Sequence, residues 1–479
     1  TRDWSSDVCS SDLNWEMKKT LSLWNFFTIG FGAMIGTGWI LLVGDWIVLG
    51  GGPIAAMTAY LICALFLIPI CMVFGELGAA IPVAGGIIEY VDRTYGRKLS
   101  YVTGWFLVLG NGILPAWSAI AVSTLISKMF GNIFPIIRSV KLYTILGDDV
   151  YLIPTVVSLI FVTYVVRLNF LGARSAARLQ GFLTKMLLTG MLIAMIISFV
   201  KGGPENLKPA FSAVQEGAVK TGGGTMLAGI AAVLVMAPFF YTGFDTVPQQ
   251  VEEAKEGIAW KHFGTVIVLA LLATAFFYIV CIYSFGTILP WTEFIKRPVP
   301  ALACLNDING ILYILMLTIA TLGPLGPMNS FYSASARIIL AMGRKRMLPE
   351  IFGRLDPVRR TPKGANILLA VFTFVAPFFG SNLLVPLTNV SSFSFIFACT
   401  TVSLACFKMR KTEPDLYRPY KVLGGRAGIF SGVLAGIIIM GLMIVPESPA
   451  ALSTVEWLIV LSWLVLGTLF ANADRKSVV

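Results

Sequence analysis

The stretch Asn25-Phe-Phe-Thr-Ile-Gly-Phe-Gly-Ala-Met-Ile-Gly-Thr-Gly-Trp39 places four glycines within nine residues of an apolar segment. Glycine lowers helix stability because its main chain loses the most freedom on folding. Main chain that leaves the helical hydrogen-bond pattern at membrane depth is tolerated only when it lines a cavity or is buried in protein. The stretch therefore predicts a membrane helix interrupted near its middle. The simpler alternative is close helix packing, because Gly32 and Gly36 form a GxxxG pair.

A second apolar segment carries a similar signal. It reads Met236-Ala-Pro-Phe-Phe-Tyr-Thr-Gly-Phe-Asp245. Pro238 has no N–H for the carbonyl four residues earlier, and Gly243 adds main-chain freedom. An ordinary proline kink is the simpler alternative. The two segments together favour two broken helices.

Composition places these segments in a membrane protein. The 479 residues are 57% hydrophobic and 13% charged, and the mean hydropathy is +0.81. Soluble domains are about 25% charged. The net charge of +11 lies in short clusters between apolar runs, as in loops beside an anionic membrane surface. That distribution argues against a nucleic-acid partner.

Twelve apolar segments are long enough to be candidate transmembrane helices. They cover 24–49, 53–81, 99–127, 151–169, 177–200, 225–251, 262–288, 309–341, 365–380, 382–407, 428–446 and 454–471. With both termini in the cytoplasm, most of the 36 Lys and Arg residues fall in cytoplasmic segments, as the positive-inside rule requires. We therefore expect an all-α, multi-pass protein of the cytoplasmic membrane. Residues 1–13 differ in composition from the rest and are expected to be a non-native extension, and part of the tail 472–479 is similarly suspect.

The two interruptions fall in the first and sixth segments. They are five spans apart, an odd number, so the two broken helices run in opposite senses, a pattern that indicates the binding site of a secondary transporter. At each break, free amides attract a carboxylate and free carbonyls attract an ammonium group. We expect the amides of Gly36, Thr37 and Gly38 to bind the carboxylate of an α-amino acid. Carbonyls of Met34, Phe239 and Thr242 are expected to bind its amine.

Five motifs resemble the amino acid–polyamine–organocation transporter superfamily. They are Gly32-Ala-Met-Ile-Gly-Thr-Gly38, Phe74-Gly-Glu-Leu-Gly-Ala-Ala-Ile-Pro82, Gly243-Phe-Asp245, Ala336–Pro349 and Pro414-Asp-Leu-Tyr-Arg-Pro419. The resemblance implies a leucine-transporter-type five-plus-five inverted repeat with two extra C-terminal helices. Its first repeat would cover 14–200, the second 225–408, and the added helices 428–471.

The resemblance also implies alternating access and a substrate bound between helices one and six. The expected substrate-binding residues are Met34, Ile35, Gly36, Thr37, Gly38, Phe239, Tyr241, Thr242 and Gly243. Relatives place an aromatic gate over the substrate, which implies Phe239, with Phe240 and Tyr241 as alternatives.

Ionisable residues inside apolar spans suggest how transport is driven, because such residues are costly there. Asp245 lies on the second broken helix and is expected to have a gating or proton-linked role. Lys185 is expected to couple proton movement, by resemblance to relatives with a lysine in span five. That lysine position is nearer Leu187 here, so the alternative is that Lys185 reaches to the interface. For Glu76, near the inner end of span two, structural pairing is favoured.

The coupling ion is a proton or, alternatively, sodium, for which Ser330 and Ser333 are the nearest hydroxyls. No other cofactor is expected, and the residues give no metal or catalytic site, so an enzyme is disfavoured. The favoured function is secondary active transport of amino acids, by proton-coupled symport or exchange. The alternatives are an ethanolamine or polyamine permease and a non-transporting nutrient sensor on the same fold.

Overall fold

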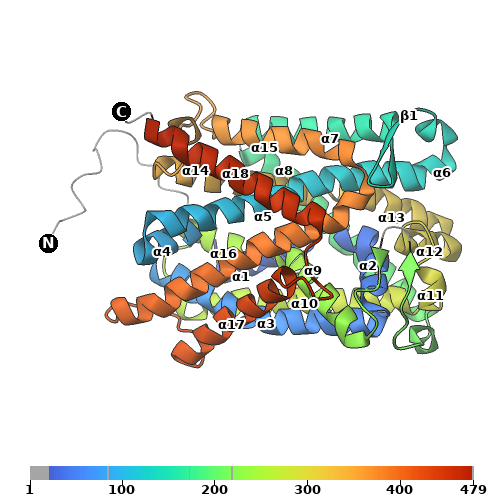
Figure 1. Ribbon diagram of the computed structural model, residues 1–479, viewed down its shortest axis with the longest axis horizontal. Helices are drawn as coiled ribbons and strands as arrows, with labels where there is room; N and C mark the ends of the chain where they lie inside the picture. The colour runs from blue at the N-terminus through green and yellow to red at the C-terminus, as the bar shows by residue number, and fades with distance from the viewer. Residues whose placement is uncertain (1–20, 84–85, 172, 217–218, 477–479) are drawn as a thin grey trace.

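The computed structural model describes residues 21–83, 86–171, 173–216 and 219–476. The suspected extension at 1–13 and the end of the 472–479 tail lie outside these ranges. The chain is folded almost entirely into helices that run side by side (Figure 1).

The helices follow the predicted segments. Their bounds are α1 Leu23–Met34, α2 Gly38–Gly50, α3 Pro53–Ala80, α4 Gly86–Tyr95, α5 Arg97–Leu125, α6 Gly131–Ile133, α7 Leu152–Leu171, α8 Ala173–Lys201, α9 Met226–Tyr241, α10 Phe263–Gly286, α11 Trp291–Phe294, α12 Pro300–Ile308, α13 Gly310–Leu322, α14 Leu325–Arg344, α15 Lys363–Val375, α16 Leu384–Thr412, α17 Gly425–Ile444 and α18 Thr454–Lys476. Short helices include η1 Ile126–Phe130, η2 Pro135–Arg138, η3 Pro204–Leu207, η4 Phe244–Thr246, η5 Pro248–Glu253, η6 Trp260–His262, η7 Glu350–Phe352, η8 Ala376–Phe379 and η9 Ser381–Leu383.

Polar residues at the helix starts explain several of these bounds. The Ser22 hydroxyl accepts from the amide of Asn25, and the Asn25 side chain accepts from the Ser22 amide, which begins α1 with a capping box. Thr225 caps α9, and the Asn309 side chain accepts from two amides at the start of α13. Pro53 occupies the first turn of α3, where its missing N–H removes no helical hydrogen bond.

Within the described residues, nine helical segments are long and apolar enough to cross a membrane, and α1 with α2 forms a tenth as a bent pair. The fifth predicted span lies within α8, and the ninth corresponds to the shorter apolar stretch Lys363–Phe379. The chain is therefore a mostly helical, multi-pass membrane protein. The count of twelve spans and the inverted repeat remain predictions.

Two connections contain small hairpins that the sequence did not predict. Strands β1 Lys141–Ile145 and β2 Asp148–Tyr151 pair antiparallel, as do β3 Gln215–Glu216 and β4 Val219–Lys220. Asp148 accepts from the amide and the hydroxyl of Ser381, so the first hairpin is fastened to the connection between α15 and α16. Apart from Tyr151, the first residue of the segment 151–169, these strands lie outside the apolar segments.

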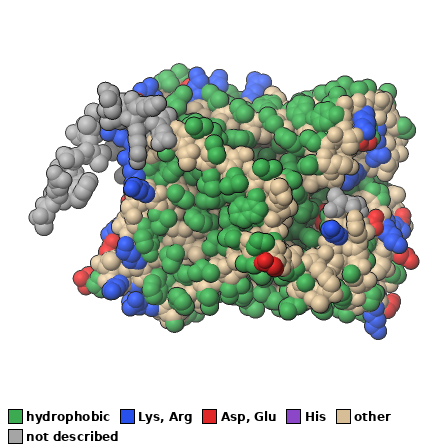
Figure 2. All heavy atoms as spheres, in the orientation of Figure 1, with side chains coloured by type: hydrophobic (Ala, Val, Ile, Leu, Met, Phe, Trp, Pro, Cys, Tyr) green, Lys and Arg blue, Asp and Glu red, His purple; other side chains and the backbone are tan. Residues whose placement is uncertain are grey.

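The helices differ in how deeply they are buried. In the most apolar part of Arg97–Ile133, 89% of residues are buried inside the protein, compared with 22% in Thr454–Ala471. Thus α5 is central and α18 lies at the periphery. Figure 2 shows hydrophobic side chains across the middle of the molecule, with Lys, Arg, Asp and Glu gathered toward its two ends. This distribution fits a bundle surrounded by lipid with polar ends in water.

The two ends of the bundle carry different elements (Figure 1). One end, the α4 end, holds α4 and the end of α18. The opposite end, the hairpin end, holds β1, α6 and α12. The charge distribution predicts that the α4 end faces the cytoplasm.

Candidate substrate site

The first helix is broken where the glycines predict it. Helix α1 ends at Met34, α2 begins at Gly38, and their axes differ by 58°. Between them, Ile35 has extended main-chain angles. The interpretation as simple GxxxG packing is therefore insufficient, because the main chain leaves the helical conformation at Ile35.

The second break occurs at the predicted place and touches the first. Helix α9 ends at Tyr241, Thr242 is extended, and Gly243 has φ of 135°. A Cβ atom on Gly243 would lie 2.9 Å from the Ala33 carbonyl carbon and 3.0 Å from the Met34 nitrogen. Any side chain would collide with the end of α1, so glycine is required here for conformation and for space. Residues distant in sequence thus bring two unwound segments into contact.

The start of α2 has the properties expected of an anion site. Thr37 is the N-cap residue, is 3% exposed, and its side chain makes no capping hydrogen bond. The first amides of a helix lack partners within that helix and carry its positive dipole end. A carboxylate placed at Gly36, Thr37 and Gly38 would accept hydrogen bonds from these amides without a positively charged side chain.

The carbonyls expected to bind the amine already have neighbours. The Tyr278 hydroxyl donates to the Met34 carbonyl at 3.0 Å, and the Phe239 carbonyl accepts from the Thr242 amide at 3.3 Å. A carbonyl oxygen can accept two hydrogen bonds, so a substrate amine would be a second partner. Tyr278 is a contact that the sequence analysis missed, because it lies in an uninterrupted apolar helix.

The three candidate gate residues point to different neighbours. Phe240 packs against Trp46 and Tyr278, with ring centroids 4.8 and 5.8 Å apart. The Tyr241 hydroxyl donates to the Tyr60 carbonyl at 3.0 Å. Phe239 instead lies 5.6 Å from the Trp117 ring of α5. The ring centroids of Phe239 and Phe240 are 5.0 Å apart, so all three side chains belong to one packed aromatic cluster, and Phe239 stays the gate that the resemblance implies.

Ser392 on α16 supports the broken helix at Pro238, and sequence reasoning missed it. Its hydroxyl accepts from the Phe239 amide and donates to the Met236 carbonyl, each at 3.0 Å. The hydroxyl therefore binds main-chain groups close to the proline. The only hint in the sequence was the serine-rich start of the tenth span, which does not say which hydroxyl would face α9.

The junction between α13 and α14, also missed, lies beside the first break and keeps helical main-chain angles at Gly323 and Pro324. The eighth predicted span is divided into α13 and α14 at Gly323-Pro324. A Cβ atom on Gly323 would lie 2.3 Å from the Thr37 methyl carbon, and one on Gly36 would lie 3.3 Å from Pro327 Cγ. The signal was present in Gly323-Pro-Leu-Gly-Pro327. This segment packs directly against residues expected to bind substrate.

Three of the candidate coupling residues, Asp245, Ser330 and Ser333, lie on the elements that form or contact the two breaks. Asp245 is fully buried, and its carboxylate accepts from the Gly243 amide at 3.1 Å and from Gln249 Nε2 at 3.3 Å. This carboxylate is therefore hydrogen-bonded to the second break. Ser330 and Ser333 are half-buried on α14. Ser330 lies one helical turn after Pro327 and shares the face that packs against Gly36.

Lys185 is not brought to the breaks. Its side chain is exposed on α8, whereas Leu187 is 3% exposed and its Cδ1 approaches within 3.5 Å of the Cβ position of Gly323. Two residues correspond to about 200° around a helix, which explains the difference. The lysine position implied by the resemblance is thus occupied by an apolar side chain, and the geometry of Lys185 favours the interfacial alternative.

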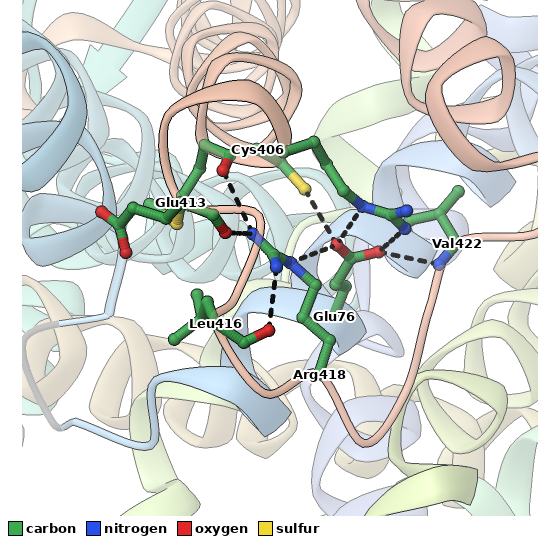
Figure 3. Close-up of polar contacts among 8 residues, drawn as sticks. Glu76, Cys406, Glu413, Leu416, Arg418 and Val422 are labelled. Carbon is green, nitrogen blue, oxygen red and sulfur yellow. Dashed lines mark hydrogen bonds and ion pairs between the residues drawn. The ribbon is translucent and has the colours of Figure 1, made fainter.

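Glu76 forms a buried ion cluster, the arrangement that its position in the sequence favoured. Its carboxylate accepts two hydrogen bonds from Arg410, at 2.7 and 2.6 Å, and one from the Val422 amide at 2.8 Å. Arg418 approaches the same carboxylate at 3.2 Å. Figure 3 shows the Arg418 side chain and Val422 with dashed contacts to Glu76. Because every oxygen of this carboxylate is engaged, its role is to fasten the connection after α16 to α3.

The family of this chain follows from its similarity to known proteins. Residues 21–469 match the sequence model of the family described as amino acid permease. The chain belongs to the amino acid permease family. It is similar to the methylthioribose transporter of Bacillus subtilis (strain 168), 24% identical over 95% of this chain and 92% of that protein. It also resembles the branched-chain amino acid permease BcaP of the same organism, 24% identical over 85% of this chain and 84% of that protein.

A third relative from the same organism is the glutamate/serine transporter AimA, also 24% identical, over 85% of this chain and 74% of that protein. The family and these relatives are transporters, so this permease is a transporter and not an enzyme. Membership also places it in the superfamily indicated by the five sequence motifs.

Proposed function

We propose that this permease is a secondary active transporter of α-amino acids that works by alternating access. The observation that carries the proposal is the contact between the two breaks, where Gly243 lies against Ala33 and Met34. Beside that contact, α2 begins without a side-chain cap at Thr37. Uncapped amides and unwound carbonyls within one region suit a ligand that carries a carboxylate and an amine together.

The coupling ion in this proposal is the proton, and Asp245 is the group that carries it. The carboxylate is fully buried and hydrogen-bonded to Gly243, so a change in its protonation would act directly on the unwound segment. A buried carboxylate is costly in its charged form, which favours a functional role. By the charge distribution, the α4 end and both termini face the cytoplasm, and the membrane is the cytoplasmic membrane.

A second candidate substrate class comes from the similarity to the methylthioribose transporter, which covers 95% of this chain. A thio-sugar has neither an α-carboxylate nor an amine and would not need the uncapped amides at Thr37. Simple amines also lack the carboxylate and would not need these amides either. The start of α2 should therefore contribute to the affinity for amino acids, but not to the affinity for thio-sugars or simple amines.

Uptake into proteoliposomes tests the proposal. Purified protein should take up labelled L-amino acids saturably and stereoselectively, and the Gly36→Leu variant should not. Excess L-amino acid should inhibit, whereas methylthioribose and ethanolamine should not. If methylthioribose or ethanolamine inhibits uptake and no amino acid does, the site binds a thio-sugar or a simple amine instead. Binding without uptake would favour a sensor.

A further inference from the structure

The connection between α14 and α15 is strongly basic. Helix α14 ends at Arg344 and α15 begins at Lys363. Residues 344–363, here called the basic loop, contain seven Lys or Arg residues and two acidic residues, Glu350 and Asp356. The helices on both sides of the loop are apolar. Because it joins two such helices, the basic loop is held close to the surface of the membrane.

Part of this positive charge has no acidic partner. Lys345 is paired with Glu89 and Asp92 of α4, each at 2.6 Å, which places the loop at the α4 end. The Arg344 and Arg346 side chains are exposed and make no hydrogen bond or ion pair with the described residues. Clusters of Lys and Arg next to a transmembrane helix attract anionic lipid headgroups. Both guanidinium groups are therefore available to a negatively charged partner.

The basic loop also exposes apolar side chains among its charges. Val358 is 86% exposed, Ile351 is 62% exposed and Leu355 is 38% exposed. Single exposed apolar residues are common on protein surfaces. Three of them in one short basic connection indicate a surface that meets a membrane or another partner. A partner that carries both negative charge and apolar groups matches this surface.

Val358 lies at the tip of an ordered turn. Asp356 Oδ1 accepts from the amides of Val358 and Arg359, at 3.0 and 2.7 Å. The Asp356 amide donates to the Thr361 carbonyl at 2.8 Å, and Pro357 restricts the main chain within the turn. The fold therefore holds an apolar side chain and its basic neighbour outward, so that little further ordering is needed for binding.

Close main-chain contacts make the basic loop one compact unit. A Cβ atom on Gly353 would lie 3.1 Å from the Arg344 nitrogen, and one on Gly364 would lie 2.6 Å from the Ile351 carbonyl oxygen. The start, the middle and the end of the loop thus lie together.

The basic loop rests on the least buried helices of the bundle. The Thr361 hydroxyl donates to the Phe170 carbonyl at the end of α7, at 3.5 Å. Phe352 packs against Phe470 of α18, with ring centroids 5.4 Å apart. In the most apolar parts of these two helices, only 33% and 22% of the residues are buried inside the protein. The loop therefore lies at the rim where the bundle meets lipid.

We propose that the basic loop binds anionic phospholipid headgroups of the leaflet at the α4 end. Arg344, Arg346 and Arg359 contact the phosphates, and Val358 inserts among the headgroups. Such binding combines apolar contact with electrostatic attraction to anionic lipids. A soluble acidic protein segment would match the charge alone and has no reason to bind at the lipid rim. Lipid binding here goes beyond the proposed function and does not depend on it.

Fluorescence quenching by lipids tests this contact in the full-length permease. Val358→Cys in a Cys9→Ser background places one reactive thiol on the turn, because the other six cysteines are buried. The labelled protein is placed in phosphatidylcholine nanodiscs that contain brominated phosphatidylglycerol or brominated phosphatidylcholine at the same mole fraction. The anionic lipid should quench the label at least about twofold more strongly. Salt at about 1 M, which screens charges beyond about 3 Å, should abolish the difference.

Leu227→Cys, labelled in the same background, is the matched control. Leu227 is 76% exposed at the start of α9, and residues 221–233 around it contain no charged residue. The two lipids should quench this label equally. Replacing Arg344, Arg346 and Arg359 together by Gln should remove the difference at residue 358 as salt does. The melting temperature should not change, because the three side chains are exposed.

Three results would overturn the proposal. Equal quenching of the label at residue 358 by the two lipids would show no preference for anionic headgroups. Quenching by aqueous iodide, with none by either lipid, would show that the turn faces water. A full preference for phosphatidylglycerol in the triple arginine variant would show that these cations do not bind the lipid. Uptake of substrate is not measured in any of these experiments, so their failure leaves the proposed function intact.

Discussion

The main chain of Gly243 lies against Ala33, so that the unwound end of α9 and the end of α1 share one contact. A Cβ atom on residue 243 would lie 2.9 Å from the Ala33 carbonyl carbon, and the φ of 135° is one that other residues rarely adopt. This single relationship fixes how the two broken helices approach each other and therefore where free amides and carbonyls face the same ligand.

Gly243→Ala should abolish transport. The substitution introduces a collision with α1 and a strained backbone, at a cost of about 1–3 kcal/mol, and separates the two breaks. The measurement is uptake into proteoliposomes, with melting temperature as a check on folding. Gly441→Ala is the matched control, because a Cβ atom there meets nothing within 4 Å. Full activity of Gly243→Ala would show that the contact is not needed.

Gly36→Leu and Gly36→Ala separate packing from ligand binding. A Cβ atom at Gly36 has one close neighbour, Pro327 Cγ at 3.3 Å, so alanine should fold and retain part of the activity. Leucine extends further across the start of α2 and should abolish binding of labelled substrate, while expression remains measurable. Wild-type affinity of the leucine variant would exclude the amides of residues 36–38 as the carboxylate site.

Ser392→Ala should impair transport by leaving two main-chain groups of α9 without their partner. The Phe239 amide would lose its acceptor and the Met236 carbonyl its donor, at about 1–3 kcal/mol for an unsatisfied buried group. The initial rate of uptake should fall about tenfold or more. Ser394→Ala is the control, since its hydroxyl donates only within α16, to Val390. Equal rates for the two variants would contradict the role of Ser392.

Glu76→Gln should destabilise the protein more than it changes substrate affinity. Arg410 and Arg418 would keep their charge with no carboxylate to receive it, and removing one partner of a buried ion pair costs about 3–5 kcal/mol. Thermal unfolding in detergent measures this loss. Glu350→Gln is the control, because the Glu350–Arg354 pair is largely exposed and surface pairs contribute little. Matching melting temperatures would contradict the structural role of Glu76.

Asp245→Asn should remove the pH dependence of uptake. Asparagine resembles the protonated acid in size and neutrality, and its Oδ1 atom can still accept from the Gly243 amide. If the wild type takes up substrate faster as the pH falls, the variant should be nearly constant over the same range. Uptake rates from pH 5 to pH 8 test this, a range that includes ordinary physiological conditions. An unchanged pH profile would assign proton coupling elsewhere.

The sequence predicts the helical segments and both glycine-dependent breaks because apolar length, proline and glycine act locally. It also favours structural pairing for Glu76, since an acid near basic loops has partners available. It does not reveal that the Gly323-Pro324 junction packs against Thr37, because that contact depends on how the helices pack together. The partners of Ser392 depend on which face of α16 meets α9. The rotation of each helix about its own axis is set by packing. In a helix that is apolar on all sides, the sequence pattern does not show which face meets its neighbour.

Lys185 illustrates the same limit. Its type and span matched an expectation from relatives, yet a difference of two positions turns its side chain outward and places Leu187 beside Gly323. The short hairpins were missed for another reason. Their strands have at most five residues, too few for a clear alternating pattern. The hydrogen bond between Asp148 and Ser381 also joins connections that are distant in sequence.

The most direct test of the central claim is competition for binding to the purified permease by three forms of one L-amino acid: the zwitterion, its α-amide and its analogue without the amino group. If main-chain amides at residues 36–38 bind the carboxylate and unwound carbonyls bind the amine, the zwitterion should displace labelled substrate. Each altered form should then bind at least about tenfold more weakly, the effect of losing one charged hydrogen-bonded contact. Equal displacement by all three forms would contradict recognition of an amino acid by the two breaks.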